Sequence, residues 1–247
     1  MSIHPKAKFP GISAWIAEGP IAHRGLHDKT QGRFENTLSA ARAAVDQGFA
    51  IEVDLHPSAD GVPMVFHDHD LERLTGRKGS MRAHSAAELV TFSIGGTGDT
   101  IPTLRQLLEV VGGKVGLVLE LKGEAGADAG FVEAVAETIS GYKGPLALMS
   151  FDHWLVADAR RLVRDRPIGL TADGNDERHD EHSAFAAQAD VDFVSYGIAD
   201  LPCRFVSEFR ESGKPVISWT IRTPELAAKS ALYADQITFE GFDPRTL

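Results

Sequence analysis

Short hydrophobic runs with the character of β-strands alternate with longer amphipathic segments along most of this chain of 247 residues. The runs are rich in Val, Ile, Leu and Phe, and the segments between them repeat their apolar residues with the spacing of an α-helix. Predicted strands span residues 20–22, 49–55, 115–121, 146–151, 168–171, 193–196, 215–221 and 236–239. Predicted helices span residues 36–47, 103–111, 129–140, 153–163, 182–189, 204–211 and 224–233.

The number of these units predicts the fold class. Eight predicted strands separated by helices in about 250 residues are typical of a (β/α)8 TIM barrel, whereas a doubly wound open sheet more often has five or six strands. Residues that commonly border helices support the boundaries: Asn36 or Thr37 can cap the first helix, and Pro224 can begin the last one. We therefore expect an α/β protein in which residues 1–247 form a single TIM-barrel domain.

The alternation breaks between residues 57 and 102, after the second predicted strand. A turn around Gly61 is followed by a short hydrophobic run that ends at His67, and the rest is glycine-rich and irregular. Long irregular connections in compact domains often carry function. We predict that residues 57–102 form a small, irregular insertion in the barrel.

Polar residues close three of the hydrophobic runs at positions where core packing would favour Val, Ile or Leu. The first run ends in His23-Arg24-Gly25, the second in Glu52-Val53-Asp54 and the third in Glu120-Leu121-Lys122. Side chains alternate along a strand, so Glu52 and Asp54 share one face of it. Residues at the carboxyl ends of barrel strands meet in one layer. We therefore expect the three carboxylates to lie close together.

This polar layer indicates metal-assisted phosphoryl chemistry. Three adjacent carboxylates repel one another unless a cation joins them, and an all-oxygen set of ligands suits Mg²⁺ or Ca²⁺ better than a softer metal. Arg24 and Lys122 could neutralise the charge of a bound phosphate, the first through its planar guanidinium and the second as a point charge. The predicted cofactor is one divalent cation, Mg²⁺ or Ca²⁺, with Glu52, Asp54 and Glu120 as its ligands.

His23 and His67 are the candidates for proton transfer. Cleavage of a phosphodiester needs a base for the nucleophile and an acid for the leaving oxygen, and imidazole titrates near neutral pH. His23 lies at a strand end beside Arg24, and His67 ends the short run in the insertion. The sequence leaves open which histidine is the acid and which is the base.

Composition narrows the choice of partners. The chain has 25 Lys and Arg against 35 Asp and Glu, and the net charge of −10 disfavours charge-driven binding to nucleic acids or anionic lipids. The single cysteine, Cys203, has no partner for an intramolecular disulfide. No segment approaches the roughly 20 apolar residues of a transmembrane helix. We expect a cytoplasmic protein without stable membrane insertion and with a small-molecule substrate; homo-oligomer formation stays open.

Five motifs, in this order along the chain, resemble those of the glycerophosphodiester phosphodiesterase family. They are His23-Arg24-Gly25, Glu35-Asn36-Thr37, Glu52-Val53-Asp54, His67-Asp68 and Glu120-Leu121-Lys122, with weaker similarity at Ser150-Phe151-Asp152 and Trp219-Thr220. The resemblance implies a (β/α)8 barrel with a small insertion after the second strand. It also implies hydrolysis of glycerophosphodiesters to glycerol 3-phosphate and an alcohol, in which a glycerol hydroxyl attacks phosphorus and water then opens a cyclic phosphate.

Carried over motif by motif, the resemblance implies roles for individual residues. Metal binding falls to Glu52, Asp54 and Glu120, acid/base catalysis to His23 and His67, and phosphate contact to Arg24 and Lys122. Glu35 either supports the metal ligands from behind or lies on the metal side of the site, or it is simply a carboxylate favoured at a helix amino terminus. Phe151 and Trp219 could line the substrate cleft or belong to the core.

Two segments depart from the family pattern. Ile221-Arg222 follows Trp219-Thr220 where a small hydrophobic residue and Asn are common, and Thr238-Phe239-Glu240-Gly241 lacks the frequent Thr-Asp-x-Pro. Both departures bear on the identity of the alcohol. Arg222 could recognise an acidic headgroup or be a solvated loop arginine. The departures therefore leave open a phosphodiesterase of lysophospholipase D or sugar-phosphodiester type. A non-catalytic barrel that binds phosphorylated ligands is a further alternative, because motifs can persist without turnover.

Overall fold

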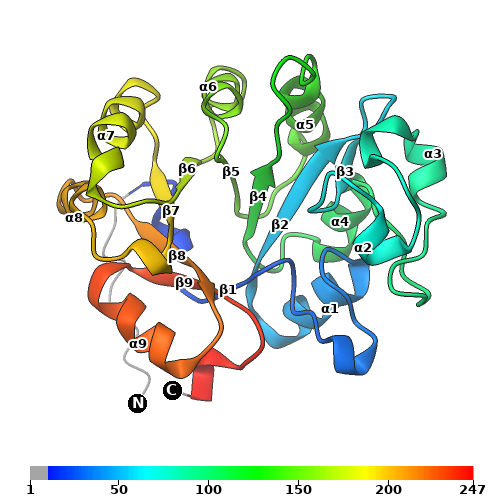
Figure 1. Cartoon of the computed structure of the whole chain (residues 1–247), viewed down its shortest axis with the longest axis horizontal. Helices are drawn as coiled ribbons and strands as arrows, with labels where there is room; N and C mark the ends of the chain where they lie inside the picture. The colour runs from blue at the N-terminus through cyan, green and yellow to red at the C-terminus, as the bar shows by residue number, and fades with distance from the viewer. Residues whose placement is uncertain (1–10, 247) are drawn as a thin grey trace.

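Nine strands form one sheet in the computed structural model, which describes residues 11–246. The strands are β1 Ile21–Ala22, β2 Ala50–Pro57, β3 Pro63–Val65, β4 Leu117–Leu121, β5 Leu146–Ser150, β6 Ile168–Ala172, β7 Phe193–Gly197, β8 Val216–Ile221 and β9 Gln236–Phe239. All pairings are parallel except that of β3 with β2, and β1 pairs with both β9 and β2 to close a barrel (Figure 1). The predicted (β/α)8 barrel is confirmed.

Helices surround the barrel (Figure 1). They are α1 Leu38–Gln47, α2 Glu72–Thr75, α3 Ala86–Leu89, α4 Leu104–Val111, α5 Phe131–Ile139, α6 His153–Leu162, α7 His179–Gln188, α8 Arg204–Glu211 and α9 Pro224–Tyr233. Thr37 caps α1 by accepting a hydrogen bond from the amide of Ala40, and Pro224 begins α9 as predicted. Within residues 11–246, none of these helices has the length and hydropathy needed to cross a bilayer.

Two hydrophobic layers hold the barrel together. Outside the strands, side chains such as Val53 and Leu55 pack in the core shared with the helices, as the alternation along β2 predicts. A smaller cluster consists of Ile16, Ile21, Val118, Ala147, Met149, Phe193 and Ile217. Gly169 makes room for it, because a Cβ there would stand 2.4 Å from the Phe193 ring. The polar strand ends lie further along the same strands, at the carboxyl end of the barrel.

The insertion is more ordered than the sequence indicates. Residues 57–102 contain β3, α2 and α3, which lie together on one side of the barrel (Figure 1). They have a hydrophobic core of their own, formed by Met64, Phe66, Leu71, Leu74, Met81, Leu89, Phe92, Ile94 and Ile101. The prediction of an irregular segment is therefore wrong, because helices of four residues are too short to show an apolar period. For a related reason α7, whose first turn is polar, begins at His179 and not at residue 182.

Candidate active site

The strands β2 and β4 place the three predicted carboxylates at one end of the barrel. Glu52, Asp54 and Glu120 are buried, and one oxygen of each lies within 4.8 Å of the others. The parallel register aligns Asp54 with Glu120, and alternation brings Glu52 to the same face of β2. All three line a cavity of about 600 Å³. The structure thus brings these residues together as a carboxylate trio.

The electrostatics of the carboxylate trio fit a hard divalent cation. Burial, reinforced by the charges of Asp54 and Glu120, raises the pKa of Glu52 well above its ordinary value. The pKa of Asp54 is lowered instead, because Lys122 and Arg24 outweigh the effect of burial. Lys122 Nζ lies 3.0 Å from Asp54 Oδ1 and also contacts Glu120. The protein's own cations therefore compensate the trio incompletely, and its all-oxygen donors are those that Mg²⁺ or Ca²⁺ prefers.

A tight turn after β1 brings Arg24 to the carboxylate trio. Arg24 and Gly25 both have left-handed backbone conformations, with φ of 55° and 80°. A Cβ on Gly25 would stand 2.9 Å from the Cβ of Ala40, so only glycine fits against α1. The amide of Arg24 donates to Glu52 Oε2 at 3.0 Å, and Arg24 Nε lies 3.4 Å from Asp54 Oδ2. The motif His23-Arg24-Gly25 thus supplies both the turn and a guanidinium beside the trio.

Asn36 holds Asp54 from a second side, a role that the sequence analysis missed. Its side-chain Nδ2 donates to Asp54 Oδ2 at 2.8 Å, and its Oδ1 accepts from the Asp54 amide at 3.3 Å. Its backbone is left-handed, with φ of 55°, which Asn tolerates better than most residues. Thr37 takes the capping role that the sequence allowed to either residue.

Glu35 lies between two arginines, outside the carboxylate trio. Its Oε1 accepts from Arg24 Nη1 at 2.6 Å, and Arg73 donates to both of its oxygens at 2.7 and 2.9 Å. Despite burial, the hydrogen bond from Arg73 and the charge of Arg24 lower the pKa of Glu35 to about 2. Glu35 therefore holds Arg24 beside Asp54 without joining the carboxylate trio, which is the geometry of a residue that supports the metal ligands from behind.

His67 reaches the same cavity from the insertion. It follows β3 closely in sequence, lines the cavity, and has its Nδ1 2.7 Å from Asp68 Oδ1. Arg73 of α2 donates to both oxygens of Asp68, at 2.5 and 2.9 Å, and thereby links Asp68 to Glu35. Because Asp68 occupies Nδ1, Nε2 is the ring nitrogen left for a ligand.

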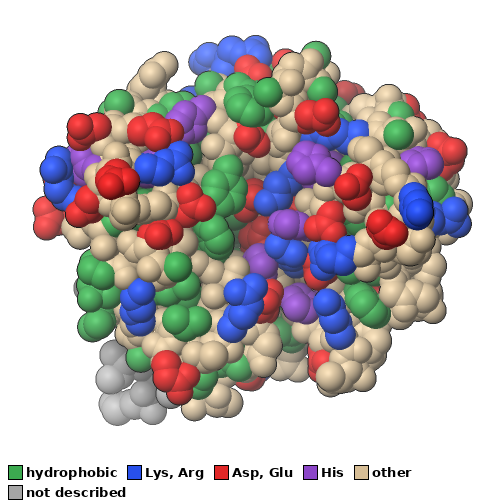
Figure 2. Space-filling model, viewed as in Figure 1, with side chains coloured by type: hydrophobic (Ala, Val, Ile, Leu, Met, Phe, Trp, Pro, Cys, Tyr) green, Lys and Arg blue, Asp and Glu red, His purple; other side chains and the backbone are tan. Residues whose placement is uncertain are grey.

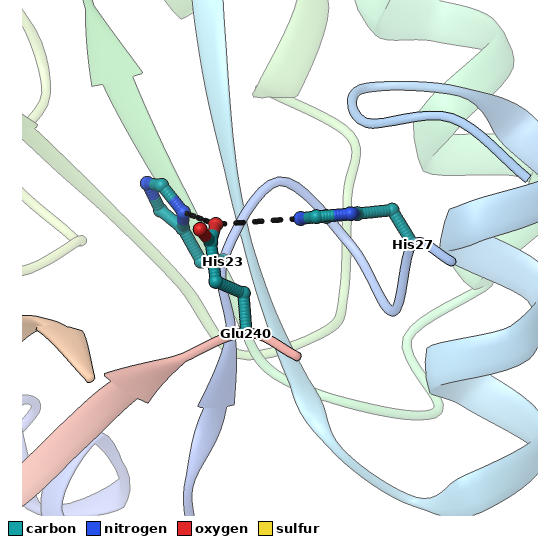
Figure 3. A group of neighbouring side chains, drawn as sticks. All are labelled: His23, His27 and Glu240. Carbon is teal, nitrogen blue, oxygen red and sulfur yellow. Dashed lines mark hydrogen bonds and ion pairs between the residues drawn. The ribbon is translucent and has the colours of Figure 1, made fainter. Parts of the chain in front are cut away.

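His23 lies just after β1, with its Nε2 4.0 Å from Glu52 Oε2. Its Nδ1 lies 2.6 Å from Glu240 Oε2, and His27 Nε2 approaches the same oxygen at 3.4 Å from the other side (Figure 3). Burial lowers the pKa of His23, although the hydrogen bond to Glu240 opposes that shift. Arg222 Nε donates to the second oxygen of Glu240 at 2.7 Å. Glu240 was noted in the sequence only as part of an atypical segment.

Phe151 and Trp219 form an apolar part of the cavity wall. Their rings pack edge to face with centroids 5.5 Å apart, and neither side chain belongs to the hydrophobic core clusters. Lys122 Nζ lies 5.8 Å from the centroid of the Phe151 ring. Figure 2 shows basic, acidic and histidine side chains gathered around a hollow in this face, with hydrophobic side chains beside it.

Arg82 ties the insertion to the loop after β4. Its Nη1 donates to Asp128 at 2.7 Å and its Nη2 to the carbonyl oxygen of Lys122 at 2.6 Å. The amide of Lys122 in turn donates to the carbonyl of Leu55 at the end of β2. Arg82 thus helps to place Lys122, and no local sequence signal marks it, because Asp128 and Lys122 lie 46 and 40 positions away.

By fold and site, the protein is a TIM barrel whose grouped carboxylates, histidines and cations suit a hard cation together with an anionic ligand. The model of the glycerophosphoryl diester phosphodiesterase family matches residues 23–240, and the chain belongs to this family. The family resemblance stated from the sequence motifs is therefore confirmed.

Individual proteins extend the similarity. A glycerophosphodiester phosphodiesterase from Caldanaerobacter subterraneus is 29% identical over 160 residues, so that the match covers 61% of this chain and just under two thirds, 65%, of that protein. The Bacillus subtilis protein YhdW, provisionally named for the same activity, is 26% identical over 218 residues, or 85% of this chain and 88% of its own length. A structure of an Oleispira antarctica phosphodiesterase in complex with the product sn-glycerol-3-phosphate is 27% identical, with a TM-score of 0.80 and coverage of 90% of this chain and 92% of that one.

Proposed function

We propose that the protein hydrolyses glycerophosphodiesters to glycerol 3-phosphate and an alcohol, with one divalent cation, Mg²⁺ or Ca²⁺, as its cofactor. The observation that carries the proposal is the carboxylate trio with His23 and His67 around one cavity, in a chain of this family. The product bound to the Oleispira antarctica phosphodiesterase supports the same substrate class.

Glu52, Asp54 and Glu120 would hold the cation. When bound, the ion would polarise a phosphoryl oxygen and make phosphorus more electrophilic. Arg24 and Lys122 would neutralise the remaining phosphate oxygens, because both already lie against the carboxylate trio. Phe151 and Trp219 would pack against the carbon atoms of the substrate.

His23 and His67 would move the protons. One imidazole accepts the proton of the glycerol hydroxyl as its oxygen attacks phosphorus, and the other donates a proton to the alcohol oxygen as its bond to phosphorus breaks. Water then adds to the cyclic phosphate with the roles reversed, giving glycerol 3-phosphate. The Nδ1 atom of each imidazole is hydrogen-bonded to a carboxylate, Glu240 for His23 and Asp68 for His67. Nε2 is therefore the reacting nitrogen of both.

The first experiment measures product release. Purified protein is incubated with glycerophosphocholine and glycerophosphoethanolamine in the presence of Mg²⁺, Ca²⁺ or EDTA, and glycerol 3-phosphate is followed by a coupled assay. We expect release with a metal and none with EDTA. E120Q should abolish release, whereas E225Q, at an exposed carboxylate on α9, serves as the matched control. If no glycerol 3-phosphate is released with any metal, the proposal is contradicted.

A diester without a neighbouring hydroxyl tests the cyclic intermediate. Bis(p-nitrophenyl) phosphate has an excellent leaving group but no hydroxyl that could attack phosphorus. We expect it to be a poor substrate under conditions where glycerophosphocholine is cleaved. Preference for the nitrophenyl diester would favour a general phosphodiesterase in place of the proposed activity.

A further inference from the structure

The carboxylate of Glu240 lies beside His23 although 217 positions separate the two residues. The backbone explains this proximity. The amide of His23 donates to the carbonyl of Phe239 at 2.9 Å where β1 and β9 close the barrel, and the amide of Glu240 donates to the carbonyl of Ile221 at 3.0 Å. The closing seam of the barrel therefore brings His23, Glu240 and Arg222 together at its carboxyl end.

The side chains complete this arrangement. Glu240 Oε2 lies 2.6 Å from His23 Nδ1, Glu240 Oε1 accepts from Arg222 Nε at 2.7 Å, and only 12% of the His23 and 18% of the Glu240 side chain is exposed. Because Arg222 donates a charged hydrogen bond to Oε1, Glu240 is a carboxylate paired with a guanidinium; although burial opposes the shift, its hydrogen bonds with His23 and with Arg222 lower its pKa. A carboxylate paired in this way only accepts hydrogen bonds, so the 2.6 Å contact places the proton of His23 on Nδ1 and the lone pair on Nε2.

The geometry is that of a hydrogen bond and not of a metal centre. His23, His27 and Glu240 offer ligand atoms within 4.8 Å of one another. Two ligands of a tetrahedral Zn²⁺ with bonds of about 2.0 Å would stand about 3.3 Å apart, whereas Nδ1 of His23 and Oε2 of Glu240 are 2.6 Å apart. That distance suits a charge-assisted hydrogen bond.

We propose that Glu240, braced by Arg222, is a positioning residue that fixes the tautomer of His23 and directs its Nε2 to the carboxylate trio. Nε2 lies on the side of Glu52, where the substrate phosphate would bind. Without a partner on Nδ1, the ring would divide its proton between the two nitrogens and lose its fixed orientation. The two atypical segments of the sequence, at Arg222 and at Glu240, therefore act as one unit. The inference rests on the acid/base role proposed above for His23.

Kinetics of E240Q test the inference first. A glutamine amide can donate to Nδ1 and so favours the wrong tautomer; by analogy with carboxylate partners of ligating histidines, kcat should fall about tenfold to hundredfold while KM stays within about twofold. E240D should restore part of the loss. H27Q is the matched control, because His27 touches the same oxygen but does not line the cavity, and it should retain kcat. Unchanged kcat in E240Q would overturn the inference.

A double variant separates positioning from a structural role. If Glu240 acts only through His23, H23A/E240Q should be no slower than H23A alone. Losses that multiply in the double variant would overturn the inference, because Glu240 would then act independently of the imidazole.

Histidine side-chain ¹⁵N spectra of the full chain read the tautomer without turnover. The His23 signal, assigned by its loss in H23A, should show a protonated Nδ1 in the wild type and in H27Q, and a changed proton distribution in E240Q. An inactive wild type with this tautomer change would defeat the proposed function and still support the orientation by Glu240. A His23 tautomer that is the same in the wild type and E240Q would overturn the inference.

Discussion

The two histidines at the cavity are each held by a carboxylate that pairs with an arginine, but the supporting residues are close in sequence for one histidine and distant for the other. Nδ1 of His67 is hydrogen-bonded to the carboxylate of Asp68, the next residue, and Arg73 pairs with that carboxylate. Nδ1 of His23 is hydrogen-bonded to Glu240, and Arg222 pairs with Glu240. The first set lies within seven consecutive residues of the insertion, whereas the second exists only where the barrel closes.

The difference separates local from global requirements for a working site. The residues that support His67 lie within the insertion, which has its own hydrophobic core, although Arg73 also pairs with Glu35 outside it. The His23 support needs β1, β8 and β9 to be paired correctly, because its residues adjoin those strands. Variants that affect one support and leave the other intact can therefore measure each contribution.

Removing either imidazole should have the largest effect. We expect H23A and H67A each to lower kcat about 100- to 10,000-fold, because each variant lacks one proton-transfer group. Comparing glycerophosphocholine with a glycerophosphodiester of p-nitrophenol, a better leaving group, should distinguish the two. The variant that lacks the general acid should regain kcat with the p-nitrophenol diester, because this leaving group needs no proton. The variant that lacks the general base should stay slow with both substrates. Near wild-type kcat in both variants would contradict the paired roles.

Removing the supporting carboxylates should have the next largest effect and should differ between the two sides. Both E240Q and D68N should lower kcat about tenfold to hundredfold. D68N should also raise KM, because it releases Arg73, which pairs with Glu35 beside the proposed phosphate contact Arg24. Steady-state kinetics on glycerophosphocholine measure both parameters. A rise in KM for E240Q but not for D68N would contradict the expected difference between the two supporting carboxylates.

Removing the arginines that pair with the supporting carboxylates should change stability on the His67 side, at Arg73, but not on the His23 side, at Arg222. R73Q leaves the buried carboxylate of Glu35 with Arg24 alone, so the free energy of unfolding should fall by about 1 to 3 kcal/mol. R222Q removes an exposed guanidinium and should change it by no more than about 0.5 kcal/mol. Urea unfolding of both variants and the wild type provides the measurement. A larger fall in the free energy of unfolding for R222Q than for R73Q would contradict this prediction.

Lowering the pH should weaken the ion pairs of Glu35 with Arg24 and Arg73, and its effect on the free energy of unfolding should be no larger than that of R73Q. The pKa of Glu35 is about 2 in the folded protein and 4.5 ordinarily, so its stabilisation is complete above 4.5 and is lost as pH falls toward 2. Between about pH 5 and pH 3.5, the wild type should lose about 1 kcal/mol of unfolding free energy more than E35Q. Parallel pH-dependent slopes for the two proteins would show that Glu35 is not ionised in this way.

The barrel and the carboxylate trio could be predicted because both follow from periodicity along single strands. Alternation places Glu52 and Asp54 on one face, and parallel register aligns Asp54 with Glu120 at the same height. The insertion was predicted in position but not in structure, since α2 and α3 are too short to show a helical period.

The supporting residues could not be predicted because their partners are distant in sequence. Arg82 reaches Lys122 across 40 positions, and Glu240 reaches His23 across 217. A strand pattern specifies which face a side chain takes but not which strand closes the barrel beside it. Asn36 illustrates a subtler limit, because its local sequence fits a helix cap equally well.

The seam between β1 and β9 also sets the order in which a growing chain acquires its active site. A ribosome adds Glu240 217 residues after His23, so a nascent chain carries the imidazole long before its partner. β1 has only two residues and needs β2 and β9 on its flanks to be held in the sheet. The surroundings of His23 are therefore completed only after β9 has been made and has paired with β1.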